Sequence, residues 1–466
     1  MNKRIYPWLL VGLLSFNFGV VYFDRNTLNF LMPLIQPELH LSNEQVGMLG
    51  SALSLSWALA GLVVGRLSDV LGRRKLILVI AAFIFSAASM LSGWVTSFAM
   101  LLVTRLMMGF AEGGVMPISQ ALISAEIDPA RRGLAMGVAQ NFGANLLSNF
   151  LGPIVVVNFG LAFGWRSAFY LAALPGVVAA VLMWWLLREP TPKEVAVPAI
   201  AGGANAPGDS GAVGGGPSTS GAGGLGAACG GPGTSGASDS GGADRGPGAR
   251  GRGGSGGASN GPGAGGAAWK QRNVLLCVGM SISLVAFIVV FAIFMPLYLV
   301  NVRHMPQPVM AWLMSMFGLT SMLFAFLVPG SSDVLGRRPV VISMSLIAAL
   351  IPLAALFVHQ PLWVVFVLFA LGAAMSGVFP LAMATIPSET VPPQQLATVL
   401  GLTMGLGEII GGVFAPTLAG RAADSSGLGA TLWILIGLSI VTSVLACFIQ
   451  ETAPRVLRQR VPALAV

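Results

Sequence analysis

Long apolar stretches separated by short polar breaks run along most of this chain. A helix that crosses a bilayer needs roughly 17 to 25 apolar residues, whereas the strands of a membrane barrel would give short segments of alternating polarity. The pattern therefore predicts membrane-spanning helices. Reading the apolar runs between polar breaks gives twelve spans, near residues 8–36, 44–66, 75–94, 98–120, 133–160, 165–187, 273–300, 308–330, 339–358, 362–386, 395–420 and 428–450.

The apolar pattern stops between about residues 191 and 268, where Gly, Ala, Ser and Pro dominate. Such a segment cannot bury enough apolar surface to offset its ordering entropy, so we expect a flexible cytoplasmic linker. This divides the chain into an N-terminal six-helix bundle over residues 1–190, the linker over 191–268, and a C-terminal six-helix bundle with a short cytoplasmic tail over 269–466.

Composition supports an integral membrane protein, because 55% of the residues are hydrophobic and only 9% are charged, against about 25% charged in soluble chains. The three cysteines lack metal or redox spacing, and no H-E-x-x-H motif, P-loop or histidine cluster occurs. We therefore expect no enzyme activity, no cofactor and no metal site.

The net charge of +8 would suggest a nucleic-acid partner in a soluble protein, but here its placement matters more than its sum. With the N-terminus in the cytoplasm, the loops on the opposite side receive only Arg166, Arg303 and Arg421. The positive-inside rule then predicts that both termini are cytoplasmic, and we expect a multi-pass protein of the inner cell membrane. We expect a monomer in contact with membrane lipid and without nucleic acid.

The heptapeptide SDVLGRR occurs twice, at Ser68–Arg74 and at Ser332–Arg338, in the loop between the second and third spans of each half. The alignment extends further, since GFAEGGVMP at Gly109–Pro117 matches GAAMSGVFP at Gly372–Pro380. The chain is thus a duplicated six-helix unit with parallel halves, an arrangement that many transporters use.

The loop GRLSDVLGRRK at Gly65–Lys75 and the segment RLMMGFAEG at Arg105–Gly113 resemble motifs of the major facilitator superfamily. The segment YFDRNTLNF at Tyr22–Phe30, together with Arg105 and Glu112, is similar to the anion:cation symporter family of organic-anion carriers. The resemblance implies an all-α integral membrane fold of twelve transmembrane helices in two pseudo-symmetric bundles.

The loop motif has a physical role of its own. Its glycines permit a sharp turn, an aspartate near a helix end can meet backbone donors or arginine, and arginines hold the loop at the anionic membrane face. Contacts of this kind would bias one orientation of the two halves, although simple topology anchoring would also explain the arginines. The residues concerned are Gly65, Asp69, Gly72, Arg73, Arg74, Asp333 and Arg337.

Five ionisable residues lie well inside predicted spans: Asp24, Arg25, Arg105, Glu112 and Glu408. Leaving all five unpaired would cost on the order of 12 to 18 kcal/mol, so they must pair or face a wet cavity. The second half carries Leu368 and Met375 at the positions that match Arg105 and Glu112. This asymmetry favours a specialised site in the first half over a structural ion pair.

A polar stripe marks the fifth span, where Asn141, Asn145 and Asn149 recur every fourth residue next to Gln140. A stripe of this kind must face protein or water rather than lipid, and we expect Gln140, Asn141 and Asn145 to contact substrate. Asn145 aligns with Glu408 of the second half. Trp57 and Tyr298 are further candidates, although each could equally be an interface anchor or a packing residue.

Arginine donates two parallel hydrogen bonds to a carboxylate, so Arg25 and Arg105 are the candidate anion ligands. With the three acidic groups ionised the cluster carries a net charge of minus one, and protonation makes it positive. The resemblance implies that Asp24 in the first span and Glu112 in the fourth span handle protons. It also implies substrates such as sugar acids, sialic acids and related carboxylates. Glu408 is a third candidate for proton coupling.

We therefore expect proton-coupled uptake of a small organic anion by alternating access. The alternative is an exporter or antiporter of organic acids or drugs. Facilitator antiporters carry a G-x-x-x-G-P motif in the fifth helix, and here Ser148 replaces its first glycine. A sensor that does not transport is a further possibility on the same fold.

Overall fold

The structure is a computed structural model that describes residues 6–128, 131–189, 271–453 and 455–456. Within these residues every regular element is a helix, and twelve helical spans are long and apolar enough to cross a membrane. Each overlaps one predicted span, so the all-α twelve-helix prediction is confirmed. The linker and its two boundaries fall on residues outside this range and stay a prediction.

The first half supplies six spans, built as follows: α1 (Tyr6–Glu38), α2 (Asn43–Leu71), α3 (Arg74–Ser92), α4 (Phe98–Gly113) with α5 (Val115–Glu126), α6 (Arg132–Gly137) with η2 (Val138–Phe142), η3 (Ala144–Leu151) and α7 (Gly152–Phe163), and α8 (Trp165–Leu186). Local sequence explains several boundaries. Ser42 and Gln45 form a capping box at the start of α2, and Gly72 ends that helix in the left-handed conformation.

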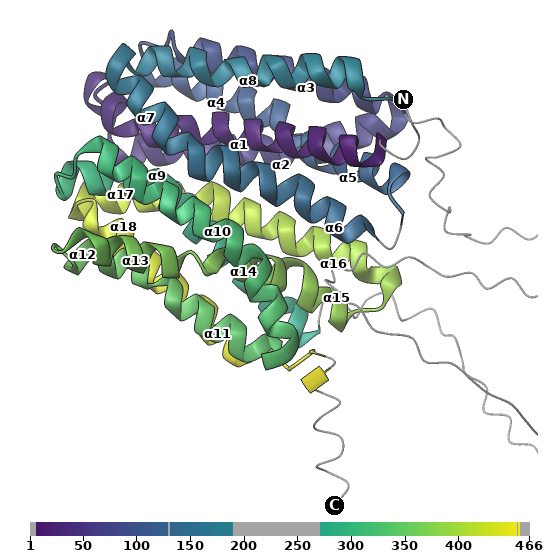
Figure 1. The fold of residues 1–466 in the computed structure, drawn as a ribbon. Helices are drawn as coiled ribbons and strands as arrows, with labels where there is room; N and C mark the ends of the chain where they lie inside the picture. The colour runs from purple at the N-terminus through teal and green to yellow at the C-terminus, as the bar shows by residue number, and fades with distance from the viewer. Residues whose placement is uncertain (1–5, 129–130, 190–270, 454, 457–466) are drawn as a thin grey trace, which may run out of the picture.

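The second half repeats this plan: α9 (Arg272–Leu297) with η6 (Tyr298–Val302), α10 (Gln307–Leu335), α11 (Arg337–Ala348) with α12 (Leu350–Phe357), α13 (Leu362–Gly372) with α14 (Met375–Pro380), η7 (Leu381–Thr385) and α15 (Ile386–Thr390), α16 (Pro393–Leu406) with η8 (Gly407–Phe414) and α17 (Ala415–Ser426), and α18 (Gly429–Cys447). Figure 1 shows the two halves as two bundles, purple to blue and green to yellow. Several helices extend past the predicted ends, for example to Glu126 rather than residue 120.

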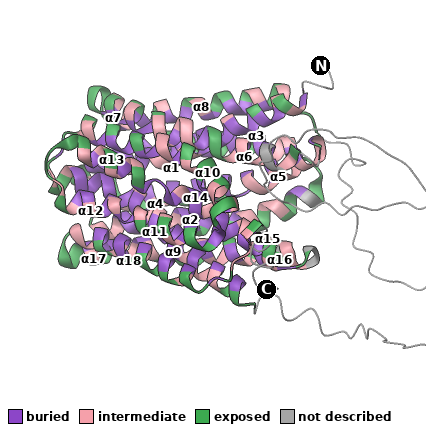
Figure 2. Cartoon of the chain, turned by 60° about the horizontal axis from the view of Figure 1, so that its bottom comes forward, coloured by how far each residue is buried: buried purple, intermediate pink, exposed green. Residues whose placement is uncertain are grey.

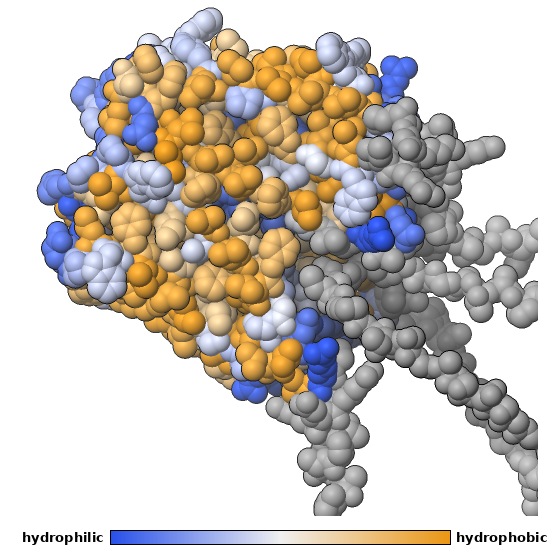
Figure 3. All heavy atoms as spheres, viewed as in Figure 1, coloured by the Kyte–Doolittle hydropathy of each residue, from blue (hydrophilic) through white to orange (hydrophobic). Residues whose placement is uncertain are grey.

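Hydrophobic side chains cover the flank of the molecule, and hydrophilic ones gather toward its two ends (Figure 3). Many outward-facing apolar residues are strongly exposed, such as Leu62 at 73% and Trp185 at 77%. Buried residues lie on the inner faces of the helices (Figure 2). An exposed apolar flank of this extent suits a lipid environment.

The two ends of the molecule differ. The first described residues and the ends of α8 and α18 lie at one end, which we call the terminal end; the opposite end is the far end (Figure 1). At the far end α2 packs along α17, and the two halves are in direct contact. Gly47 and Gly420 permit this approach, since a Cβ at either would collide with backbone of the opposite helix.

Polar contacts reinforce the closure of the far end. Asp424, at the end of α17, accepts hydrogen bonds from the backbone amides of Asn43 (2.9 Å) and Glu44 (2.8 Å) at the start of α2. Ser51 and Thr417 are hydrogen-bonded at 2.8 Å between the same two helices. Helix N-termini attract carboxylates, so Asp424 joins the halves through the α2 dipole.

Candidate functional site

A cavity of about 620 Å³ lies between the two halves. Its lining extends from Gly50, near the closed contact of α2 with α17, to Asp333 and Arg337, which lie at the terminal end. The cavity therefore reaches the terminal end and is sealed at the far end. Of the residues expected to bind substrate, Arg25, Trp57, Arg105, Gln140, Asn141 and Asn145 all line it.

Arg105 is the dominant cation of the cavity wall. Its side chain comes from α4 and is only 2% exposed, although it contributes to the cavity lining. One nitrogen, Nη1, donates to the carbonyl oxygen of Arg25 at 3.5 Å, while Nε and Nη2 have no hydrogen-bond partner among the described residues. Buried guanidinium donors without partners are costly and are poised to bind an anion.

Two carboxylates lie near Arg105 and do not belong to the cavity lining. Asp24 is fully buried and accepts a short hydrogen bond from the hydroxyl of Ser89, and Glu112 is 1% exposed with no hydrogen-bond partner on either oxygen in the described chain. Both are close enough to Arg105 for their charges to interact. The structure thus brings together the three buried charges that the sequence singled out in the first half.

The remaining two intramembrane charges, Arg25 and Glu408, form an ion pair between the two halves. Arg25 on α1 and Glu408 on η8 are 3.8 Å apart between Nη2 and Oε1, and each side chain is 17% exposed. The Arg25 guanidinium also lies 5.9 Å from the centre of the Tyr22 ring. This ion pair links the halves within the cavity itself, and an anionic ligand of Arg25 would compete with Glu408 for it.

The polar stripe of the fifth span forms an amide network with the first helix. The side chain of Asn26 donates to Ser148 at 2.9 Å and to Asn149 at 3.4 Å, and Asn29 donates to Asn26 at 3.2 Å. Asn149 in turn donates to Asn145 at 3.0 Å. Both Asn26 and Asn29 line the cavity. The sequence reasoning missed these two residues, although their spacing after Tyr22 and Arg25 places all four on one helix face.

Local helix geometry accompanies this polar lining. The fifth span contains two π-helical segments, η2 and η3, and the equivalent eleventh span contains η8. These segments carry Asn141, Asn145, Asn149 and Glu408. π-turns inside helices are frequently found at functional sites; in the described chain η6 and η7 are also π-helical, so the feature is not confined to this part of the cavity.

Tyr298 lies elsewhere. It is 5% exposed, packs in the core of the second half at the end of α9, and is not among the residues that line the cavity. The geometry supports the packing interpretation of Tyr298 and gives no support to a role in substrate binding. Trp57 lines the cavity from α2.

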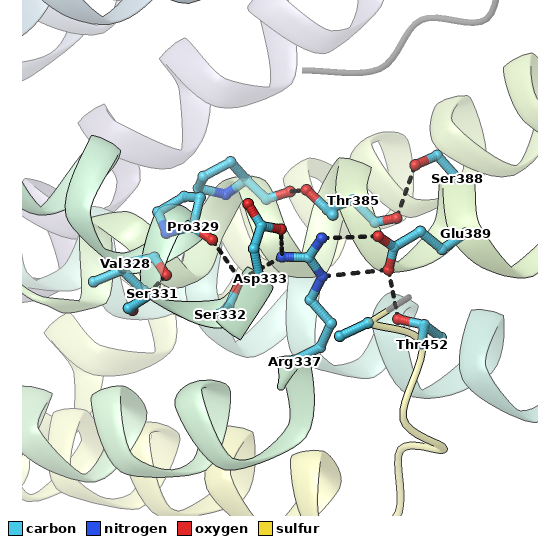
Figure 4. Close-up of polar contacts among 12 residues, drawn as sticks. Val328, Pro329, Ser331, Ser332, Asp333, Arg337, Thr385, Ser388, Glu389 and Thr452 are labelled. Atoms are coloured by element: carbon cyan, nitrogen blue, oxygen red, sulfur yellow. Dashed lines mark hydrogen bonds and ion pairs between the residues drawn. The ribbon is translucent and has the colours of Figure 1, made fainter. Parts of the chain in front are cut away.

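The second loop motif forms an ion-pair network at the terminal end, shown in Figure 4. Arg337 is buried and pairs with Asp333 at 2.6 Å and with Glu389 at 2.8 Å, and its Nε donates to the second oxygen of Glu389 at 3.3 Å. Thr452 donates to Glu389 at 2.6 Å. This network ties α10, α11, α15 and the segment after α18 together within the second half.

The first loop motif differs in detail. Arg74 is buried and Arg73 is exposed, Gly72 lies between α2 and α3, and Gly65 packs against Pro117 on α5. The side chain of Asp69 lies outside what the structure describes. At the start of α3, the carboxylate of Glu189 accepts from the amide of Lys75 at 3.2 and 3.3 Å.

A metal site finds no support in the described part of the chain, where no group of three or more His, Cys, Asp or Glu side chains is placed to hold an ion. Cys277 and Cys447 are free thiols, and Cys229 lies outside the described residues.

A family model described as Major Facilitator Superfamily matches residues 14–310 and 275–463. Among curated relatives, the chain is 30% identical over 188 residues to the "Probable sulfoacetate transporter SauU" of Cupriavidus necator, which is 40% of this chain and 42% of that protein. It is 32% identical over 182 residues to the "Hexuronate transporter" of Bacillus subtilis, covering 39% and 42%. The match thus spans about two fifths of each relative.

Other relatives differ in what their names describe. The chain is 27% identical over 165 residues to the "Multidrug resistance protein MdtL" of Salmonella newport, covering 35% of this chain and 41% of that protein. Among solved structures, the inward open conformation of the xylose transporter XylE from E. coli aligns with a TM-score of 0.68 at 14% identity, covering 96% of this chain and 98% of XylE. At this identity the structural likeness concerns the fold alone.

Proposed function

This chain belongs to the major facilitator superfamily, and on that premise we propose that it is a secondary active transporter that takes up a small organic anion together with protons. The observation that carries the proposal is the buried Arg105 guanidinium, which lines the cavity with two donors that lack partners in the described chain. A substrate carboxylate satisfies those donors with two parallel hydrogen bonds.

Coupling to protons follows from the charges around Arg105. Asp24, Glu112 and Glu408 carry three negative charges when ionised, and Arg25 and Arg105 carry two positive charges. Protonation of the carboxylates turns a cluster of net charge minus one into a positive one, which attracts an anion. Since Asp24 and Glu112 do not line the cavity, they act on the substrate through Arg105 rather than by direct contact.

The positive-inside rule assigns the terminal end to the cytoplasm, because the loops there carry most of the lysines and arginines. With the cavity reaching that end, the structure then corresponds to an inward-facing state. In the proposed cycle, a bound anion breaks the Arg25–Glu408 ion pair, and the pair forms again after the anion has been released to the cytoplasm.

The proposal is tested with purified protein in two steps. Glucuronate, galactonate and benzoate are first titrated calorimetrically against the wild type and Arg105→Ala, and the tightest ligand is then followed in proteoliposomes with an imposed pH gradient. Protein-free liposomes measure passive entry. Arg105→Ala removes the bidentate partner, so we expect binding to fall at least about 100-fold, in line with the loss of a charge-assisted pair.

Glu112→Gln separates proton coupling from binding. The glutamine resembles the protonated carboxylate, so this variant should still bind substrate and exchange it across the membrane but should not accumulate it in response to a pH gradient. Glu38→Gln, whose ion pair with Arg166 lies within the first half and outside the cavity lining, is the matched control and should accumulate substrate normally. Accumulation by Glu112→Gln driven by protons alone would transfer the coupling role to Asp24 or Glu408.

The second candidate function, export of organic acids or drugs, is favoured by the similarity to the multidrug resistance protein. The same proteoliposomes decide between the two. A symporter accumulates the anion when protons enter with it, whereas an antiporter accumulates it when protons leave the vesicle.

A further inference from the structure

The two walls of the cavity are chemically different. The wall from the first half carries arginines and amides among apolar side chains such as Phe18, Leu53 and Trp57; its polar residues include Arg25, Asn26, Asn29, Arg105, Asn145 and Asn149. The wall from the second half is formed mainly by apolar and aromatic side chains, among them Ile288, Val289, Phe291, Phe317, Phe379 and Met383. One cavity therefore offers an anion-binding face and an apolar face on opposite halves of the molecule.

Polar residues of the second half that reach the cavity are already engaged. Ser376 donates its hydroxyl to the carbonyl oxygens of Ala373 (2.8 Å) and Ser321 (3.0 Å), and Thr385 donates to the carbonyl oxygen of Pro380 (3.3 Å). Glu408 pairs with Arg25, and the remaining pair, Asp333 and Arg337, lies at the terminal end. Among the described residues that line this wall, both hydroxyl groups thus already donate within the protein.

The aromatic part of this wall is held in place by its own packing. The ring of Phe291 lies 4.6 Å from that of Phe317 and 6.5 Å from that of Phe369, both in tilted arrangements. Phe291 and Phe317 are 2% and 9% exposed. Both rings, on α9 and α10, contribute to the cavity lining, although the core covers most of their surface.

A polyhydroxylated ligand fits this arrangement poorly. Hydroxyl groups placed against the apolar wall would lose hydrogen bonds to water and regain none, and each such loss weakens binding. An apolar ring in the same place would instead remove two apolar surfaces from water, which stabilises the complex by about 25 cal/mol for each Å² buried.

We propose that the substrates of this protein are carboxylates with an apolar body, such as an aromatic or cycloalkyl ring, rather than polyhydroxylated sugar acids. This inference rests on the proposed function, because the carboxylate is placed on Arg105. The ring then lies against Ile288, Val289 and Phe291 of the second half, so a single ligand contacts both halves.

The experiment compares three ligands with the same carboxylate on a six-membered ring: benzoate, cyclohexanecarboxylate and glucuronate. Each is titrated calorimetrically against purified protein, wild type and Arg105→Ala. We expect benzoate and cyclohexanecarboxylate to bind at least about 10-fold more tightly than glucuronate, and both to depend on Arg105.

Val289→Thr places a hydroxyl on the apolar wall with almost no change in shape. It should weaken benzoate binding several-fold and leave glucuronate binding unchanged. Val441→Thr, on the exposed face of α18, is the matched control and should not alter either affinity.

The outcomes separate this inference from the proposed function. Glucuronate binding that equals or exceeds that of benzoate and depends on Arg105 overturns the inference and leaves anion transport standing. If none of the three carboxylates binds, both fail. Benzoate binding that Val289→Thr does not weaken shows that the ring does not lie on this wall, and this also overturns the inference.

Discussion

The two copies of SDVLGRR have the same seven residues but different structures. In the first copy, Gly72 adopts φ 63° and ψ 11°, and α3 begins at Arg74. In the second, Gly336 adopts φ 104° and ψ 149°, and α11 begins one residue earlier in the repeat, at Arg337. The buried arginine is consequently the second of the pair in one copy and the first in the other.

Tertiary neighbours account for this shift. A Cβ on Gly72 would meet nothing within 4 Å, whereas a Cβ on Gly336 would lie 2.7 Å from the Glu451 carboxylate and 3.3 Å from Pro339. Glu451 also accepts from the amides of Arg337 (2.7 Å) and Arg338 (3.2 Å), while Glu189 accepts from the amide of Lys75 at the start of α3. The surroundings of each loop, rather than its seven residues, select the arginine that is buried.

The same contrast extends to the membrane-spanning part of the two halves. Arg105 and Glu112 are buried charges, whereas the matching Leu368 and Met375 pack among apolar residues of the second half. The duplicated unit therefore serves two tasks: one copy contributes charges and the other contributes an apolar wall. Each of the following predictions tests one part of this difference.

The largest effect on stability is expected when the aligned residues Arg105 and Leu368 are each replaced by the residue type of the other half. Leu368→Arg introduces an unpaired charge into an apolar environment, at a cost of about 3 kcal/mol, and we expect poor membrane insertion and a strongly lowered melting temperature in detergent. Arg105→Leu leaves the buried carboxylates of Asp24 and Glu112 without their neighbouring cation, but its new side chain is apolar, so we expect a smaller fall in melting temperature together with the loss of ligand binding. Comparable thermal stability of the two variants would refute this asymmetry.

A second prediction concerns the arginine pairs of the two loops. Arg74→Ala and Arg337→Ala remove buried side chains and should each lower the free energy of unfolding by about 2 to 3 kcal/mol. Arg73→Ala and Arg338→Ala remove exposed side chains and should stay within about 0.5 kcal/mol of the wild type. Thermal unfolding of the four purified variants is the measurement. Arg73 and Arg337 occupy aligned positions in the two heptapeptides. If Arg73→Ala and Arg337→Ala lowered the free energy of unfolding equally, the conclusion that a different arginine is buried in each copy would be wrong.

A smaller difference is expected for the two capping glutamates. Glu451→Gln weakens contacts to two backbone amides at the start of α11, and we expect a loss of about 1 kcal/mol; Glu189→Gln weakens a contact to one amide and should cost about half as much. Hydrogen exchange at the starts of α3 and α11 would report each cap separately. Faster exchange at both helix starts in a single variant would argue against two independent caps.

The smallest effect is expected from the chain that joins the halves. In this structure the halves are held by direct contacts, including that of Asp424 with α2 and that of Ser51 with Thr417. Replacing residues 191–268 with about 25 Gly and Ser residues should leave uptake unchanged in the proteoliposome assay, since a Gly/Ser coil is flexible and constrains the two halves little. Normal membrane insertion with lost uptake would assign the segment a function.

The sequence was sufficient for the fold and for the positions of the buried charges. Spans are long and apolar, and a charge inside one is conspicuous, so Asp24, Arg105, Glu112 and Glu408 could be identified by inspection. The fifth-span asparagines were detectable for the same reason, because amides in a span must face protein or water.

Other features were beyond the reach of the sequence. A helix that is apolar on all sides carries no periodicity, so nothing along the seventh span, α9 with η6, distinguished Phe291, which contributes to the cavity lining, from Tyr298, which does not. The two identical heptapeptides could not indicate that Arg74 and Arg337 are the buried arginines. Which arginine is buried depends on Glu189 and Glu451, which are distant in the chain. The Arg25–Glu408 pair joins different halves and required their relative placement.

The carboxylate of Asp424 is exposed where it meets the start of α2. Attraction between exposed charges and helix dipoles weakens as ionic strength rises, and at physiological salt it is screened over a Debye length of about 8 Å. Dissolved ions in the compartment that the far end faces therefore loosen the contact that closes that end, while ions in the other compartment do not reach it. Through Asp424, the closure of the far end becomes sensitive to the ionic strength of the solution at that end.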